Sequence, residues 1–259
     1  MSEVQYAKGL EGVIAAESEI CRIDGENGKL YYLGYPIQDL VEHCDFEEVV
    51  YLLLYGELPN EGKYKHFSNR MRSGRDVSEP VKSMLREFPH DSHPMEVLQA
   101  VISYLSGYVE HKIQHDANCN CRTTLHQIAQ LTTAVAALHR FRRGEEYVPP
   151  RIDLSHGANF LYMLRGEEPS EMEGQIMDDC LTIHAEHSLN ASTFTARVVA
   201  STLSTCYCSI SAAIGALYGS LHGGANEKVM RMVDEIGSPD KAEAWVDKAL
   251  SEKRKVMGM

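Results

Sequence analysis

One long, almost uncharged segment, residues 193–217, most constrains what this chain can fold into. It carries a single formal charge, Arg197; one of its faces is apolar, and Ala, Ser and Cys fill most of the rest. As a helix, its 25 residues would extend over roughly 37 Å. Small residues let neighbouring helices approach closely. The segment therefore predicts one continuous buried helix, at the axis of a helical core or in half of a subunit interface.

The remaining pattern predicts a mainly α-helical chain with a short β element at its start. Apolar residues around a turn rich in Gly25, Asn27 and Gly28 predict a hairpin or pair of strands within 13–35. Apolar spacing, capping residues and glycine stops predict the helices that follow. These are expected in 46–55, as two exposed helices in 60–90, from Pro94 to just before Gly107, and in 122–143, 155–165, 170–184, 227–236 and 239–256.

The chain changes character after Asn226, where charged amphipathic helices replace the apolar segment. Gly223 and Gly224 favour a boundary just before that change. We therefore predict a large helical domain in 1–222 and the beginning of a smaller one in 223–259.

Composition excludes several classes of function. A net charge of -12 argues against a general nucleic-acid binder, because phosphate binding needs a basic face. The sequence contains no run of about 18 uninterrupted apolar residues, which a membrane span would need. It also contains no apolar region after a basic start, which a signal peptide would need. Seven scattered cysteines, an odd number, suit reduced thiols, so we predict a cytoplasmic protein.

His222, in the sequence S-L-H-G-G-A-N, is the first candidate for chemistry. It stands before a predicted helix, whose N-terminal potential is expected to lower the imidazole pKa and keep the ring neutral. A neutral imidazole can donate a hydrogen bond to a carbonyl oxygen that gains charge, and Gly223 and Gly224 would let substrate approach closely. The same residues also fit a plain turn with a hydrogen-bonded histidine.

A second polar group, H-A-E-H-S-L-N-A-S, precedes the uncharged segment. His184 and His187 are three residues apart, so they are predicted to share a helix face, with Asn190 and Ser192 just beyond. We interpret the group as a binding site for a small anionic or carbonyl substrate, since no well-spaced third metal ligand is nearby. The alternative is a polar helix end capped by Asn190, Ser192 and Thr193.

A third polar group contains His111, His115, Cys119 and Cys121, which are residue types that bind zinc. Their spacing matches no standard zinc pattern, and we interpret the segment as a solvated loop. We therefore predict no metal site. Two cysteines in the apolar segment are interpreted as core residues: Cys206 and Cys208.

A basic cluster stands near the end of this acidic chain, where residues 253–259 read K-R-K-V-M-G-M. One interpretation is a contact with phosphate and adenine groups. The other is the ordinary basic C-terminus of a helix, which the helix dipole favours.

Taken in order, these motifs resemble the citrate synthase family, particularly its compact bacterial and archaeal type. The resemblance runs along nearly the whole chain and is far more specific than any one motif. It is carried by K-G-L-E-G-V at 8–13, C-R-I-D-G at 21–25, L-x-Y-x-G-Y-P-I at 30–37, F-E-E-V-V-Y-L-L-L-Y-G-E-L-P at 46–59, S-H-x-A-N-F-L-Y-M-L at 155–164, A-E-H-x-x-N-A-S at 185–192 and H-G-G-A at 222–225.

The resemblance implies a reaction and a role for several residues. In this family acetyl-CoA loses a methyl proton, the enol attacks the ketone of oxaloacetate, and hydrolysis releases citrate and CoA. His222 would stabilise the enol by a hydrogen bond to the thioester carbonyl, and His187 would bind oxaloacetate. The implied CoA contacts are Lys255, Val256, Met257, Gly258 and Met259.

The resemblance also implies the architecture and the partners. The expected fold is the multi-helical large domain of the family, with the start of its small CoA-binding domain. Acetyl-CoA is expected as a co-substrate, with no permanently bound cofactor. A homodimer is expected, built on the helices around 193–217.

The family pattern continues with a Gly-His-Arg-Val-Tyr-like motif, and later with the aspartate base and the arginines that hold the carboxylates. This sequence stops before them, so we expect a truncated chain that lacks synthase activity by itself. The close alternative is 2-methylcitrate synthase, which uses propionyl-CoA. Two other hypotheses stay open: a non-catalytic helical dimerisation module, and a different CoA-dependent lyase or transferase.

Overall fold

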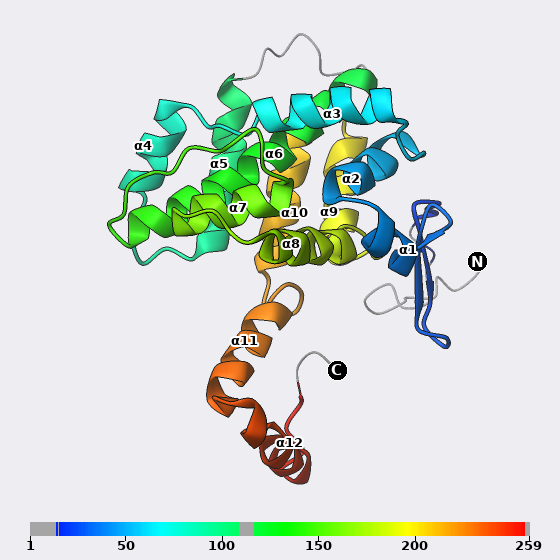
Figure 1. Cartoon of the computed structure of the whole chain (residues 1–259), viewed down its shortest axis with the longest axis vertical. Coiled ribbons are helices and arrows are strands. Elements are labelled where there is room, and N and C mark those ends of the chain that lie inside the picture. The colour runs from blue at the N-terminus through cyan, green and yellow to red at the C-terminus, as the bar shows by residue number, and fades with distance from the viewer. Residues whose placement is uncertain (1–13, 15, 109–116, 257–259) are drawn as a thin grey trace, which may run out of the picture. The chain divides into compact units, whose positions relative to one another are not determined.

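The computed structural model describes residues 14, 16–108 and 117–256, which form two compact units (Figure 1). One unit contains Met1–His90 and Val109–Asn190, and the other contains Asp91–Tyr108 and Ala191–Met259. Each unit has buried apolar side chains of its own, and both are mainly helical, so the predicted fold class is confirmed. In the described part of the chain, no helix is long and apolar enough to span a bilayer.

The first unit begins with a small antiparallel sheet. Its strands are β1 (Cys21–Asp24), β2 (Lys29–Tyr32) and β3 (Tyr35–Pro36), in the order β1-β2-β3. Asp24 closes the β1–β2 turn by accepting the Asn27 amide at 3.1 Å, and Gly28 adopts a φ of 62°. The predicted hairpin is therefore confirmed.

Seven helices follow among the described residues of this unit, and their ends follow local capping rules. Asp45 and Glu48 form a capping box at the start of α2, and Gly56 ends that helix with a φ of 83°. Ser170 and Glu173 form a second capping box, at the start of α8, where the sequence predicts a helix in 170–184. The helices are α1 (Ile37–His43), α2 (Phe46–Tyr55), α3 (Glu61–Ser73), α4 (Glu79–Glu87), α6 (Ala117–Arg142), α7 (His156–Arg165) and α8 (Glu171–His184).

The expectation of two exposed helices in 60–90 is only partly right, because one face of α3 and one face of α4 are buried. Phe67 and Met71 of α3 are buried, as are Val81 and Leu85 of α4. Each pair is spaced four residues apart and so lies on one helix face. The polar composition of 60–90 hides these apolar stripes, which help to close the core, and some of its polar residues are themselves buried: Ser68, Arg75 and Lys82.

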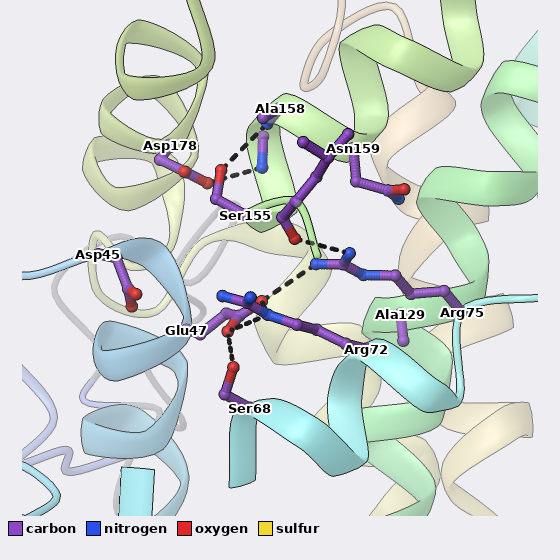
Figure 2. Close-up of polar contacts among 12 residues, drawn as sticks. Asp45, Glu47, Ser68, Arg72, Arg75, Ala129, Ser155, Ala158, Asn159 and Asp178 are labelled. Carbon is purple, nitrogen blue, oxygen red and sulfur yellow. Dashed lines mark hydrogen bonds and ion pairs between the residues drawn. The ribbon is translucent and has the colours of Figure 1, made fainter. Parts of the chain in front are cut away.

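A buried ionic network joins α2, α3 and the segment before α7 (Figure 2). The Glu47 carboxylate is 1% exposed and accepts hydrogen bonds from Arg72 Nε at 2.9 Å and Arg75 Nη2 at 3.0 Å. The Ser68 hydroxyl donates a third. The Nη1 group of Arg75 donates to the carbonyl oxygens of Arg151 and Leu154, at 2.7 and 3.0 Å. Buried charges survive only when paired in this way.

The second unit is built around α10, which packs against both α5 and α9. Ser211 of α10 lies 2.9 Å from the Ser103 hydroxyl and 3.2 Å from the Gln99 carbonyl oxygen, so small polar side chains let the helices approach. The elements of this unit are α5 (Pro94–Leu105), the 3₁₀ helix η2 (Ser106–Tyr108), α9 (Ala191–Ser201), α10 (Cys206–Tyr218), α11 (Ala225–Ile236), the 3₁₀ helix η4 (Pro239–Lys241) and α12 (Ala242–Ser251).

The prediction of one continuous buried helix over 193–217 is wrong. The chain leaves helical geometry after Ser201, Leu203 adopts a φ of 62°, and α10 restarts from Thr205, whose hydroxyl accepts the Cys208 amide at 3.1 Å. Serine and threonine side chains offer the backbone alternatives to helical hydrogen bonds, which explains a break at S-T-L-S-T. None of the residues of α9, all of them described, is buried, and Cys208 is exposed rather than in the core.

The domain boundary predicted between 222 and 223 falls inside the second unit, in the turn between α10 and α11. The chain changes units elsewhere, near His90, Tyr108 and Asn190. The boundary at 222–223 stays a prediction.

Candidate active site

His222 lies in a tight turn between α10 and α11, and is half-buried. Its amide donates to the Gly219 carbonyl oxygen at 2.9 Å, and Gly224 caps the start of α11. A Cβ atom at Gly223 would lie 1.9 Å from the Leu217 carbonyl oxygen, so no side chain fits there. The glycines next to the histidine therefore serve the turn itself, which positions His222 just before a helix N-terminus.

The imidazole of His222 is held from one side. Its Nε2 atom lies 2.7 Å from the hydroxyl of Ser192, which is in the first turn of α9. When the serine donates, Nε2 accepts, and the proton of the neutral ring is on Nδ1. The pair thus orients the ring, and leaves Nδ1 as the atom that can act on a ligand.

A cavity of about 700 Å³ lies beside this turn within the second unit. His93 caps the start of α5 by accepting the Met95 amide at 3.2 Å, and its ring stacks on Tyr218 with centroids 4.4 Å apart. The size is in the range of small-molecule sites. The lining combines apolar, glycine and charged residues: His93, Pro94, Met95, Leu217, Tyr218, Ser220, Gly223, Gly224, Glu227, Lys228 and Arg231.

His187 belongs to the first unit, and is exposed in the turn that follows α8. Helix α8 ends at His184, whose Nδ1 lies 2.7 Å from the Cys180 carbonyl oxygen of its own helix. The prediction that the two histidines share a helix face is therefore wrong. The chain turns away because Ser188 adopts a φ of 75° and its amide donates to the Glu186 carboxylate.

The basic cluster near the end of the chain follows α12, which stops at Ser251 and not near Val256 as predicted. The helix ends because Lys253 adopts a φ of 56° and the Arg254 amide donates back to Ala249 at 2.8 Å. The Arg254 guanidinium lies 4.9 Å from the centroid of the Trp245 ring. A small cavity of about 200 Å³ is lined by Lys228, Arg231, Met232, Glu235, Trp245, Arg254 and Lys255.

Several predicted site residues lie partly or wholly outside the described residues. Met257, Gly258 and Met259 are among them, as are His111 and His115. The backbone of 117–121 is helical in α6, so the prediction of a loop is wrong for these residues. Among the residues that the structure describes, no group of three or more His, Cys, Asp or Glu side chains is arranged to hold a metal ion.

Comparison with known proteins decides the family. The family model described as "Citrate synthase, C-terminal domain" matches residues 9–259. The chain belongs to the citrate synthase family. It is 43% identical to citrate synthase of Deinococcus radiodurans over 98% of this chain, and 42% identical to 2-methylcitrate synthase of Mycobacterium tuberculosis over 97%. The predicted resemblance is thus confirmed, and with it membership in a family of acyl-transferring enzymes.

The solved structures agree. Citrate synthase from the archaeon Thermoplasma acidophilum, in a ternary complex with carboxymethyl coenzyme A and oxaloacetate, matches over 98% of this chain with a TM-score of 0.88 and 29% identity. The chain spans 67%, 63% and 67% of these three relatives' own lengths. The citrate synthase fold is therefore present in the portion described.

Two tertiary contacts have no local signal in the sequence. His93 looks like a helix cap, and Tyr32 like a strand residue of the motif at 30–37. The sequence separation hides their roles: His93 contacts Tyr218, and Tyr32 contacts Thr182, 150 residues away. No local pattern predicts such pairs. In contrast, the motifs themselves predicted His222 and Ser192, although not their hydrogen bond.

Proposed function

We propose that the protein to which this chain belongs is a citrate synthase, which condenses acetyl-CoA with oxaloacetate and releases citrate and CoA. The observation that carries the proposal is the hydrogen bond between Ser192 and His222 at 2.7 Å, in a turn next to a cavity. This hydrogen bond orients the half-buried imidazole of His222, which can then act as the hydrogen-bond donor that an acyl thioester needs. Family membership supports the same conclusion.

His222 acts on the thioester carbonyl. When a base removes a methyl proton of acetyl-CoA, the electron pair moves onto the carbonyl oxygen and an enolate forms. The Nδ1–H group of His222 donates a hydrogen bond to that oxygen while Nε2 accepts one from Ser192. A donor that is already oriented stabilises the developing charge without reorganisation.

His187 is proposed to bind oxaloacetate. Its imidazole is exposed on a turn whose backbone is tied by the Ser188 amide to Glu186 and by the Asn190 amide to the Ser188 carbonyl oxygen, at 3.0 Å. An imidazole on a well-defined turn can donate to a keto or carboxylate oxygen. The position fits substrate binding better than proton abstraction.

The basic end of the chain is proposed to contact CoA. Lys255 is exposed, lines the small cavity beside Trp245 and Arg254, and offers a cation to a phosphate. The proposed contact continues through Val256, Met257, Gly258 and Met259. Acetyl-CoA is a co-substrate in this proposal, and no permanently bound cofactor is invoked.

A homodimer built on the helices around 193–217 remains our proposal for the assembly. It is supported by apolar side chains of α9 and the following turn that are exposed in the single chain: Phe194 at 37%, Val198 at 50% and Leu203 at 78%. Burial of such a face against a second copy is the usual fate of an apolar helix surface. A cytoplasmic location stays a prediction from the scattered cysteines.

One assay separates the candidate functions. The full-length protein is given oxaloacetate with either acetyl-CoA or propionyl-CoA, and free CoA is measured. Citrate synthase predicts faster release from acetyl-CoA, and release that requires oxaloacetate. Faster release from propionyl-CoA would favour 2-methylcitrate synthase, a candidate supported by the 42% identity to that enzyme of M. tuberculosis. A dimer with no CoA release from either thioester would overturn both.

A further inference from the structure

The hydroxyl of Tyr32 contacts the backbone where α8 ends. Tyr32 is 0% exposed, and its hydroxyl lies 3.0 Å from the Thr182 carbonyl oxygen and 3.3 Å from that of Ile183. The same oxygen accepts the Glu186 amide at 3.1 Å. One buried side chain of the sheet therefore acts as donor and acceptor to three backbone groups in the last turn of α8 and just beyond it.

These contacts add to the backbone hydrogen bonds at the end of α8. The Thr182 carbonyl oxygen also accepts the Ala185 amide at 3.2 Å, and the Tyr32 hydroxyl oxygen supplies an acceptor for the Glu186 amide beyond the helix. Burial raises the pKa of the Tyr32 hydroxyl, so it keeps its proton at neutral pH and remains a donor. A phenolic hydroxyl can donate one hydrogen bond and accept others at the same time.

The ring of Tyr32 has a separate role. It belongs to an apolar cluster with Leu40, Val49 and Leu52, which anchors β2 against α1 and α2. A phenylalanine would fill the same volume in that cluster. The hydroxyl, and its contacts with α8, are therefore not explained by packing alone.

The Tyr32 hydroxyl holds the amide of Glu186, which directly precedes His187, the residue proposed to bind oxaloacetate. Glu186 precedes His187, and its carboxylate in turn accepts the Ser188 amide. The backbone on both sides of His187 is thus tied, on one side to the sheet and on the other to Glu186. Cys21 is opposite Tyr32 in the strand pairing, and burial raises the pKa of its thiol, with the Glu186 carboxylate adding to the effect.

We infer that Tyr32 is a positioning residue: its buried hydroxyl fixes the end of α8 and the turn after it, and so sets where His187 presents its imidazole. The inference rests on the proposed role of His187 in binding oxaloacetate. It assigns to the N-terminal sheet a part in substrate recognition.

The test uses Tyr32→Phe in the full-length protein, with Tyr31→Phe as a matched control. Tyr31 is the preceding residue of the same strand, loses the same atom, and has its ring against Arg22 at 4.3 Å. Leaving a buried backbone group without its hydrogen-bond partner typically shifts an equilibrium by a factor of about ten or more. Amide hydrogen exchange at Glu186 is expected to accelerate about tenfold in Tyr32→Phe and to stay unchanged in the control.

Kinetics then connect the hydroxyl to His187. Tyr32→Phe is expected to raise the KM for oxaloacetate about tenfold, with kcat changed by less than about threefold, because it perturbs a binding residue. His187→Ala should raise the same KM more. In the double variant, KM is expected to equal that of His187→Ala alone, because Tyr32 acts through His187.

The outcomes distinguish the inference from the function on which it rests. Faster exchange at Glu186 together with a raised KM supports the inference. Unchanged exchange, or faster exchange with an unchanged KM while His187→Ala still raises KM, overturns the positioning role and leaves the role of His187 intact. An unchanged KM in His187→Ala overturns the substrate role itself, and with it the inference, even where exchange accelerates.

Discussion

The buried network around Glu47 and the turn around His222 both contain groups that can carry or stabilise charge, but they use them differently. Glu47 and Arg75 are at most 1% exposed, and the Glu47 carboxylate accepts from Ser68, Arg72 and Arg75. His222 is half-buried, and its Nε2 atom has one oriented partner, Ser192, beside a cavity. Charge that is paired inside the protein stabilises the fold, whereas a ring held from one side can act on a ligand.

The neighbourhood of the network shows the same contrast. His156 is 1% exposed, and burial lowers its pKa to about 3, with Arg75 and Arg72 adding to the effect. It is therefore a neutral core residue, although its sequence context is as rich in polar residues as that of His222. Histidine by itself does not mark a site: His156 is buried in the core, whereas His222 is half-buried in a turn whose neighbouring residues Gly223 and Gly224 line a cavity.

Replacement of Glu47 by Ala is expected to have the largest effect on stability. It leaves Arg75 buried without its carboxylate, and breaking a buried pair in this way costs about 3–5 kcal/mol. The free energy of unfolding from urea titration measures the loss. Glu57→Ala, which removes an exposed partner of Lys63, is the control and should change it little. A similar small loss for Glu47 would contradict the structural role of the network.

Replacement of His222 by Ala tests the other side of the comparison. Loss of a preorganised donor to a developing oxyanion typically lowers kcat by about 10²–10³-fold. Stability should change by far less than in Glu47→Ala, because the ring is only half-buried. Steady-state CoA release by the full-length protein and urea unfolding are measured together. Near-normal turnover would remove His222 from the mechanism.

The pH dependence of stability sharpens the comparison further. The pKa of His156 is 6.5 unfolded and about 3 folded, so the unfolded chain binds the extra proton first. The contribution of His156 to the free energy of unfolding is therefore fully present above pH 6.5. It is lost as the pH falls below that value, by at most about 1.4 kcal/mol per pH unit. Urea unfolding between pH 7.5 and pH 4.5 should show this slope.

His156→Phe is the matched variant, because it keeps an aromatic ring against Phe46 but cannot titrate. As the pH falls from 7.5 to 4.5, the free energy of unfolding should decrease less steeply in this variant than in the original protein. Burial raises the pKa of Asp178, which contributes with the opposite sign in both proteins, so the difference between them isolates His156. Identical slopes would show that His156 does not resist protonation in the folded state.

The smallest expected effect belongs to Ser192→Ala. It removes the hydroxyl that orients His222 but leaves the imidazole in place, and one neutral hydrogen bond contributes about 1 kcal/mol. A fall in kcat of roughly fivefold is expected, with stability unchanged. Ser192→Thr retains a hydroxyl and should recover most of the activity. Equal loss in both variants would indicate that α9, and not the hydroxyl, matters.

Much of the fold could be predicted from the sequence where local chemistry decides it. Capping box and glycine signals placed α2, α7 and α8 almost to the residue, because those signals act within one helical turn. The break between α9 and α10 was missed because helical spacing continues through it. Only the hydroxyl of Thr205 and the positive φ of Leu203 stop the helix there.

The sequence by itself determined the helical class, the family and the two candidate histidines, because these depend on spacing and on motifs that are read along the chain. Only the tertiary structure decided which groups meet: Ser192 with His222 across 30 residues, Glu47 with Arg75 across 28, and Tyr32 with Thr182 across 150. Hydrogen bonds need atoms within about 3 Å. Only the packing of helices and sheet brings residues so far apart in the chain to that distance.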